Sequence, residues 1–175
     1  RSSINPEYID WIKELSSQWH IELGLASVND EAIKDQLKLI QNIADSNQLT
    51  SKIMGWEGPL IESKSNKNSS VEQFWLTRIA LPPAKIYMLL KTKELTEISN
   101  WEWRLAAGAG IGDGWQAINQ CENSFAQSSF IENLRNQVNK LGGQLIILNQ
   151  PKQIEKRLVS WLDAPSKVII KAVKD

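Results

Sequence analysis

The stretch Arg78-Ile79-Ala80-Leu81-Pro82-Pro83 decides the fold of this chain of 175 residues. It completes an apolar segment that begins at Phe74, and it runs directly into two prolines. Proline is tolerated in the first turn of a helix, where its missing N–H would have no partner. Apolar residues follow at helical spacing, namely Ile86, Leu89 and Leu90. The stretch therefore predicts a strand over 74–81 that is followed at once by a helix.

Further elements are predicted on both sides of this unit. Alternation of apolar and polar residues predicts strands over 19–25 and 101–109, and an apolar run predicts another over 144–149. Asp113-Gly114 is typical of a tight hairpin turn. The predicted helices are one within 6–15, one with Asn29 or Asp30 as N-cap, one that starts in a capping box at Ser129 and stops at Gly142-Gly143, and one over 167–173.

The order of these elements favours an α+β fold over uniform βαβ alternation. We expect a ferredoxin-like antiparallel sheet with helices packed on one face. Residues 1–18 are expected to form an N-terminal linker or helix, and residues 19–175 a single domain. Because the chain starts without methionine and stops within a predicted helix, we also expect it to be a fragment of a longer protein.

Strand parity predicts which side chains lie on the face without helices, because alternate residues of a strand point to opposite faces. Trp19, Trp101 and Trp103 are expected to point toward the helices. On the other face we expect one partly apolar surface with five polar residues: His20, Glu22, Arg78, Glu102 and Arg104. Such a surface is either a solvated face with ordinary ion pairs, or one that docks onto another domain and presents arginine to an anionic ligand.

Composition excludes several classes of protein. Lys+Arg and Asp+Glu number 20 each, so the chain lacks the charge excess typical of nucleic-acid or anionic-membrane binding. A single cysteine, Cys121, fits a reducing compartment and predicts a cytoplasmic protein. With His20 as the only histidine, multi-histidine zinc sites are excluded, and no metal site is expected.

The glycine run from Gly108 to Gly114 matches neither a dinucleotide fingerprint nor a Walker loop, so a flexible hairpin is the favoured interpretation. The eight tryptophans are the outlier in composition. Four of them are predicted on strands at core parity, namely Trp19, Trp75, Trp101 and Trp103, whereas Trp56, Trp115 and Trp161 lie in less regular segments. Trp56 and Trp115, together with Glu102, are the candidates for an interdomain contact or a ligand wall.

Three motifs, taken in order, resemble the glycolate oxidase E subunit in the family of FAD-linked oxidases. Arg78 to Pro83 is similar to the family's W-R-L-S-V-P-P strand, with Thr77 in place of the tryptophan. Trp103 to Gly110 is similar to the strand that leads to an A-G-S-G turn, and Leu141 to Pro151 to L-G-G-x-L-V-V-x-x-A-P. Related D-lactate enzymes carry G-H-x-G-D-G-N-x-H near this turn, but Gly110 and Ala117 occupy the two histidine positions here.

The resemblance implies a C-terminal cap, or substrate, domain of an FAD-dependent 2-hydroxy-acid oxidoreductase. FAD would be bound by an N-terminal domain of the same protein, and this fragment alone would be inactive. Arg78 and Arg104 would bind the substrate carboxylate, and His20 is a candidate proton acceptor; the catalytic residue itself stays open. Other glycolate oxidase subunits would be partners, through which a cytoplasmic protein could associate with a membrane. The alternative is a ferredoxin-like ligand-binding or subunit-interaction module without catalysis.

Overall fold

The computed structural model describes residues 4, 6–14, 18–54, 74–96, 100–117, 124–152, 154 and 157–161. They form an antiparallel sheet of six strands in the order β2-β1-β4-β5-β3-β6, accompanied by helices, so the α+β class is confirmed. The strands are β1 (Tyr8–Lys13), β2 (His20–Gly24), β3 (Phe74–Ala80), β4 (Glu102–Ala106), β5 (Ile111–Ala117) and β6 (Gln144–Asn149). The α-helices are α1 (Asp30–Ser46), α2 (Ile86–Leu90), α3 (Lys93–Thr96) and α4 (Ser124–Lys140).

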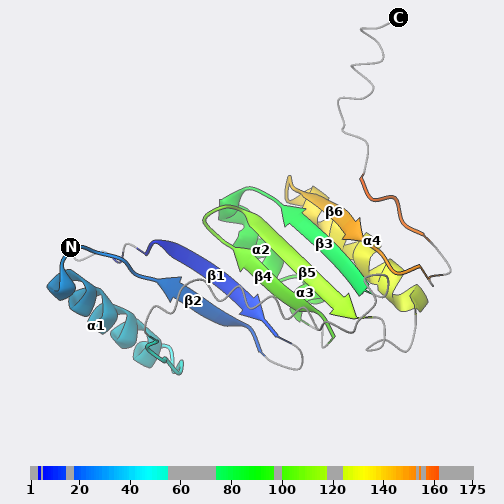
Figure 1. The fold of residues 1–175 in the computed structure, drawn as a ribbon. Coiled ribbons are helices and arrows are strands. Elements are labelled where there is room, and N and C mark those ends of the chain that lie inside the picture. The colour runs from blue at the N-terminus through cyan, green and yellow to red at the C-terminus, as the bar shows by residue number, and fades with distance from the viewer. Residues whose placement is uncertain are drawn as a thin grey trace, which may run out of the picture.

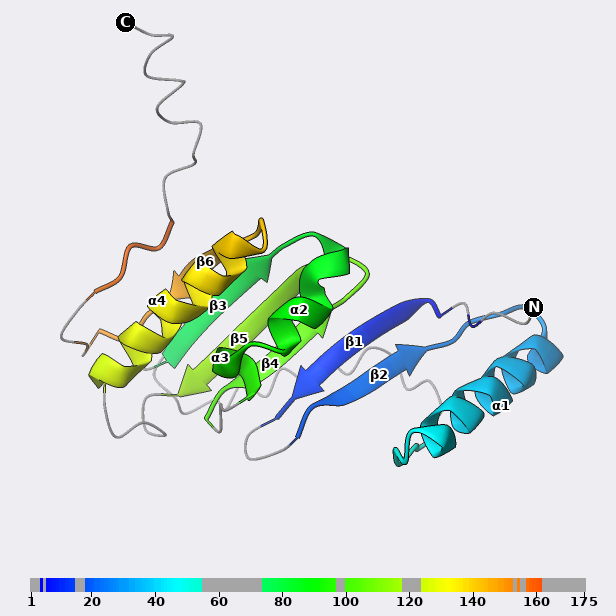
Figure 2. The same cartoon turned by 180° about the vertical axis from the view of Figure 1, so that it is seen from behind.

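Three of these helices cover one face of the sheet. Figure 2 shows α2, α3 and α4 in front of the sheet, over β4, β5, β3 and β6. Figure 1 shows the opposite face, from which the same three helices lie behind the strands. Helix α1 differs from the others, because it lies beyond the edge strand β2 in both views. The sheet therefore has a covered half, and a second half formed by β1 and β2.

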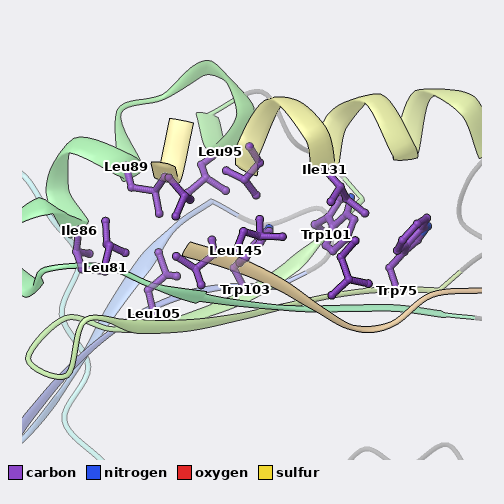
Figure 3. Close-up of a cluster of buried hydrophobic side chains, with 14 of the residues drawn as sticks. Trp75, Leu81, Ile86, Leu89, Leu95, Trp101, Trp103, Leu105, Ile131 and Leu145 are labelled. Carbon is purple, nitrogen blue, oxygen red and sulfur yellow. The ribbon is translucent and has the colours of Figure 1, made fainter. Parts of the chain in front are cut away.

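The core lies between the sheet and helices α2–α4 (Figure 3). Strand β3 contributes Trp75 and Ile79, and β4 contributes Trp103 and Leu105, all of them buried. The helices contribute Ile86, Leu89, Leu95, Ile131, Leu134 and Val138. Each such side chain stabilises the fold by about 1.5–3 kcal/mol when it leaves water. Burial on one face only is what the period-two pattern of β3 and β4 predicts.

The strand-to-helix unit at Pro82-Pro83 is confirmed. Strand β3 ends at Ala80, a 3₁₀ turn spans Pro83–Lys85, and α2 begins at Ile86. The amide of Leu81 donates to the carbonyl of Gly110 over 2.8 Å, which ties this exit to the β4–β5 turn. Gly110 has a φ of +68°, and a Cβ there would collide with that same Leu81 backbone, so glycine is required at this position.

The predictions of helix starts and stops have different outcomes. The N-cap of α1 is Asn29, whose side-chain oxygen accepts a hydrogen bond from the Glu31 amide over 2.9 Å, so this prediction is confirmed. The capping box at Ser129 is wrong, because α4 already begins at Ser124 and Ser129 is internal. The stop near Gly142 is confirmed: α4 ends at Lys140, and Gly142 takes a left-handed φ of +80°. The predicted helix over 167–173 lies outside the described residues.

The predicted helix within 6–15 is wrong, because residues Tyr8–Lys13 form β1. The apolar positions of this segment fit a helical period, but β1 pairs with two strands, β2 on one side and β4 on the other. This pairing also buries Asp10 and Lys13. Backbone pairing across the sheet thus overrides the local pattern, as tertiary context commonly does.

The predicted hairpin turn at Asp113-Gly114 is also wrong. Both residues lie within β5, opposite Arg104 and Trp103 of β4. The chain instead reverses between Ala106 and Ile111, which face each other across the hairpin. The glycines around Asp113 have a packing role: a Cβ on Gly112 would collide with the Leu105 side chain, and one on Gly114 with the Trp103 ring. Glycine in a strand often marks such a close approach.

Candidate functional site

The five polar residues predicted to share one face do so. The register joins His20 of β2, Ile12 of β1, Arg104 of β4, Asp113 of β5, Arg78 of β3 and Ile146 of β6 into a single row across the sheet. Glu22 lies one row away, opposite Asp10, and Glu102 lies in another row opposite Trp115. We call this surface the open face, because α2–α4 lie on the other side (Figure 1).

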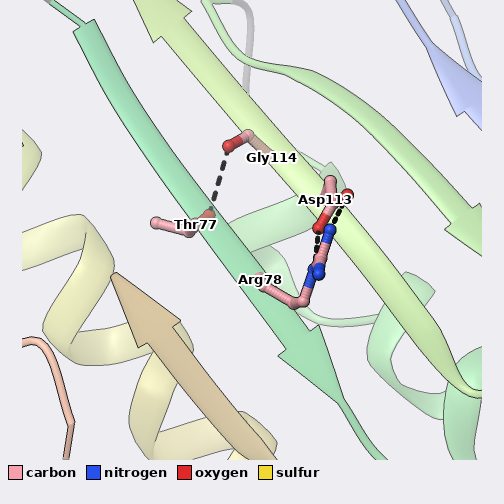
Figure 4. A network of polar contacts seen from close by, with 4 residues as sticks. All are labelled: Thr77, Arg78, Asp113 and Gly114. Atoms are coloured by element: carbon pink, nitrogen blue, oxygen red, sulfur yellow. Dashed lines mark hydrogen bonds and ion pairs between the residues drawn. The ribbon is translucent and has the colours of Figure 1, made fainter. Parts of the chain in front are cut away.

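Arg78 is held by its cross-strand neighbour Asp113 (Figure 4). Its Nε donates to Oδ1 over 2.7 Å, and its second guanidinium nitrogen donates to Oδ2 over 2.9 Å. This hydrogen bonding, followed by the attraction of the negative charge, raises the pKa of Arg78 above its ordinary value. Both side chains are nearly half exposed, at 49 % and 43 %. The pair therefore stabilises the fold by no more than about 1 kcal/mol.

Arg104 belongs to a second ionic cluster, at the junction of β4, β1 and β2. Its guanidinium contacts Oδ2 of Asp10 at 2.7 Å and Oε2 of Glu22 at 3.9 Å. The Tyr8 hydroxyl donates to Oε1 of Glu22 over 3.0 Å. Burial raises the pKa of Tyr8, and this hydrogen bond adds to the rise. Since Asp10 is only 10 % exposed, its contact with Arg104 compensates a charge that would otherwise be costly to bury.

The charge of the open face does not favour anions. The described strands place two arginines on it, against the four carboxylates of Asp10, Glu22, Glu102 and Asp113, a formal charge of −2 with His20 neutral. Each arginine already donates to a carboxylate. An anionic ligand would have to compete with Asp113 or Asp10 for its arginine.

Distances across the sheet limit how the candidate residues could act together. Neighbouring strands lie about 4.8 Å apart, so Arg78 and Arg104 stem from backbones about 10 Å apart with Asp113 between them. His20 is on the edge strand β2, four strands and about 19 Å from Arg78. A two-carbon acid cannot contact both His20 and Arg78, whereas Arg104 lies between them.

The aromatic candidates divide into three cases. Trp115 is half-buried on the open face, opposite Glu102 and Leu76, with its ring centroid 6.2 Å from that of Phe74. Trp161 is 60 % exposed, near the β6 edge, where the Ile147 amide donates to Ser160. Trp56 lies outside the described residues. Trp115 and Glu102 thus remain neighbours on one surface, as a ligand wall or an interdomain contact would require.

Sequence reasoning missed the partners of the two arginines, Asp113 and Asp10. The Asp-Gly pair predicts a turn at Asp113, whereas the structure places Asp113 within β5, on the same face as Ile111 and Trp115. Asp10 was assigned to a helix. Neither aspartate can be matched to its arginine from the sequence. Asp113 lies 35 positions from Arg78, and Asp10 lies 94 positions from Arg104.

A third arginine lies on the helix side. Arg135 of α4 is buried and donates to the backbone carbonyl of Val159 over 2.8 Å, which holds the segment 157–161 against the domain. Burial lowers the pKa of Arg135. This residue has a structural role in joining α4 to that segment, and it does not face the open surface.

Within the described ranges, no group of three or more His, Cys, Asp or Glu side chains is arranged to hold a metal ion. Of the helices in that part of the chain, none is long and apolar enough to cross a membrane. Comparison of the chain with protein-family models, with curated proteins and with solved structures yields no match.

Proposed function

We propose that this chain is the C-terminal cap domain of an FAD-dependent 2-hydroxy-acid oxidoreductase, most like the glycolate oxidase E subunit. FAD belongs to a flavin-binding domain of the same protein, against which the open face docks. The protein is cytoplasmic and works with other subunits of the oxidase. In such an enzyme the flavin accepts hydride from the substrate carbon, while the protein supplies orientation and neutralises charge.

The fold we propose is ferredoxin-like, extended by the β1–β2 hairpin. Supporting it are the chain order β3-α2-α3-β4-β5-α4-β6 and the spatial order β6-β3-β5-β4. In this arrangement each of the two helix-linked strand pairs, β3 with β4 and β5 with β6, has a strand of the other pair between its members. The three motifs of the resemblance fall on β3, on β4 with its turn, and on the end of α4 with β6. The motifs thus coincide with the elements of this one unit.

The observation that carries the proposal is that Arg78 and Arg104 lie on one helix-free face, two strands apart. Arginine can hold a carboxylate through two parallel hydrogen bonds. Because the Arg78–Asp113 pair is exposed and weak, a substrate carboxylate can displace Asp113 at little cost. As a proton acceptor, His20 would act on a ligand bound at Arg104, two strands away. A ligand bound at Arg78, four strands away, is too distant.

The test uses the full-length protein. We expect flavin absorbance in the purified protein and glycolate-dependent reduction of an artificial electron acceptor. Both Arg78→Ala and Arg104→Ala should raise the KM for glycolate, with retained flavin. Arg78→Ala should leave the unfolding midpoint nearly unchanged, whereas Arg104→Ala should lower it, because Asp10 stays buried without its partner. Arg157→Ala removes the same charge at an exposed position outside the strands of the sheet, and is the matched control. Equal effects of all three substitutions would contradict the assigned role of the two arginines.

A second function is favoured by one observation, the pairing of both arginines with carboxylates on a face of net negative charge. In this alternative the domain is a binding or subunit-interaction module without chemistry. It predicts a full-length protein without flavin absorbance, whatever its affinity for partners. Absence of flavin together with absence of glycolate turnover would exclude the oxidase and leave the module.

A further inference from the structure

The helix-side face of β1 and β2 is apolar except for the buried Lys13, and it is continuous with the core. Ile21 of β2 lies opposite Trp11 of β1, which in turn lies opposite the buried Leu105 of β4. In the next row Leu23 lies opposite Ile9. Yet Ile21 is 43 % exposed, and Ile9, Trp11 and Leu23 are only partly buried. Figure 2 shows that α2–α4 end over β4 and do not extend over this pair of strands.

Helix α1 has an apolar stripe of matching character. Ile33, Leu37, Ile40 and Ala44 recur at helical spacing, and the other side of the helix carries charged residues such as Lys34 and Lys38. Of the 17 residues of α1 only Ala44 is buried, and Ile43 is 47 % exposed. A helix in a protein gains most of its stability by burying such a stripe. In Figures 1 and 2 α1 lies beside β2 and over neither face of the sheet.

We infer that α1 is a hinged helix, which folds over the helix-side face of β1 and β2 in its own chain and extends the layer formed by α2–α4. The segment 25–29 that joins β2 to α1 has five residues and spans at most about 17 Å. So short a connection keeps α1 next to this face and gives it a high effective concentration there. Contact of the two apolar surfaces removes both from water.

The chemistry of the two faces decides which one α1 covers. On the open side the same two strands carry Asp10, His20 and Glu22. An apolar stripe placed there would strip water from these polar groups without offering hydrogen bonds in return. On the helix side the strands offer Ile9, Trp11, Ile21 and Leu23, and their one charged residue, Lys13, is already buried opposite Trp103 of β4. The charged side of α1 then remains in solvent. This inference does not depend on the proposed function.

The test is cross-linking with a short bis-maleimide in the full-length protein, with Cys121→Ser as background. Leu37→Cys on the α1 stripe is combined with Ile21→Cys on the helix side, or with His20→Cys on the open side. Both partners lie on β2 at nearly the same distance in sequence, so the second pair is a matched control. We expect the 21/37 pair to give at least several-fold more intramolecular cross-link than the 20/37 pair. Lys38→Cys, on the charged side of α1, should cross-link poorly to Ile21→Cys.

Equal yields from the 21/37 and 20/37 pairs would overturn the inference, because α1 would then have no preferred face. A cross-linked product with the mass of two chains would overturn it too, since α1 would then cover the strands of a second copy. An independent measurement is hydrogen exchange: Leu37→Asp should speed exchange in β1 and β2, and Lys38→Asp should not. Unchanged exchange with Leu37→Asp would contradict closure even if the cross-link formed.

Discussion

The covered half of the sheet and the β1–β2 half are built from the same kind of strand but differ in what packs on them. In the covered half Ile79, Trp75 and Leu145 are fully buried beneath α2–α4. In the other half Ile21 occupies a comparable helix-side position and remains 43 % exposed. The alternation in a strand decides only which face is apolar. How much that face contributes to stability depends on whether a second layer covers it.

Truncation of one isoleucine in each half gives the largest expected difference. Ile79→Ala should lower the free energy of unfolding by about 2–5 kcal/mol, because it leaves a cavity in a packed core. With α1 beside the sheet, Ile21→Ala should cost about 1 kcal/mol or less, because the side chain is half in water; the inferred closure of α1 would raise this cost. Denaturant unfolding of both variants measures this. A cost for Ile21→Ala close to that of Ile79→Ala would mean that α1 covers the strand most of the time.

A methyl group added to β5 probes the tight packing of the covered half. Gly114→Ala should destabilise the fold by about 1–3 kcal/mol, because the new Cβ collides with the Trp103 ring. Gly108→Ala, in the turn before β5, is the control: its Cβ would meet no atom within 4 Å, so stability should stay within about 0.5 kcal/mol. Similar unfolding midpoints for the two variants would show that Trp103 can move aside.

Loss of the α1 cap probes the less covered half. Asn29→Ala removes the acceptor of the Glu31 amide and should cost α1 about 1 kcal/mol. In the arrangement of Figure 1 α1 lies beside the sheet, so the loss should appear mainly as faster hydrogen exchange within α1; closure over β1 and β2 would add a loss in global stability. Asn42→Ala, at an exposed site inside the same helix, should leave exchange unchanged or slow it. A large global loss with Asn29→Ala would show that α1 unfolds together with the sheet.

The smallest effect concerns the ionic cluster of the β1–β2 half. The folded protein holds the Tyr8 proton more tightly than the unfolded chain does, because the pKa of Tyr8 is raised from 10.0 by burial and by Glu22. Its contribution is therefore fully present below a pH of about 10 and is lost as the pH rises through the folded pKa. Unfolding midpoints of wild type and Tyr8→Phe, measured from about pH 8 to about pH 11, should differ in their slope.

If Tyr8→Phe followed the wild-type slope, the hydrogen bond from Tyr8 to Glu22 would not persist in solution, and Arg104 would lack a fixed neighbour on β2.

The prediction of the open face succeeded because parity is a local property. Once β3 and β4 were assigned, Arg78 and Arg104 had to point away from Trp75 and Trp103, and the register confirms this. The prediction of a turn at Asp113-Gly114 was wrong, because the same two residues also suit this strand. Asp113 faces the open side, and Gly114 leaves room for the Trp103 ring on the other side. The partners of the two arginines could not be predicted, since long-range pairing selects them.

By itself the sequence determined the α+β class, four of the six strands, the N-cap of α1 and the sidedness of the polar residues, since these depend on spacing and on conformational preferences of single residues. Only the tertiary structure decided that residues 8–13 form a strand, that each arginine has a carboxylate partner and that β1 and β2 lie outside the helix layer. These features depend on pairing and burial between segments distant in the chain, whose free energies no local pattern contains.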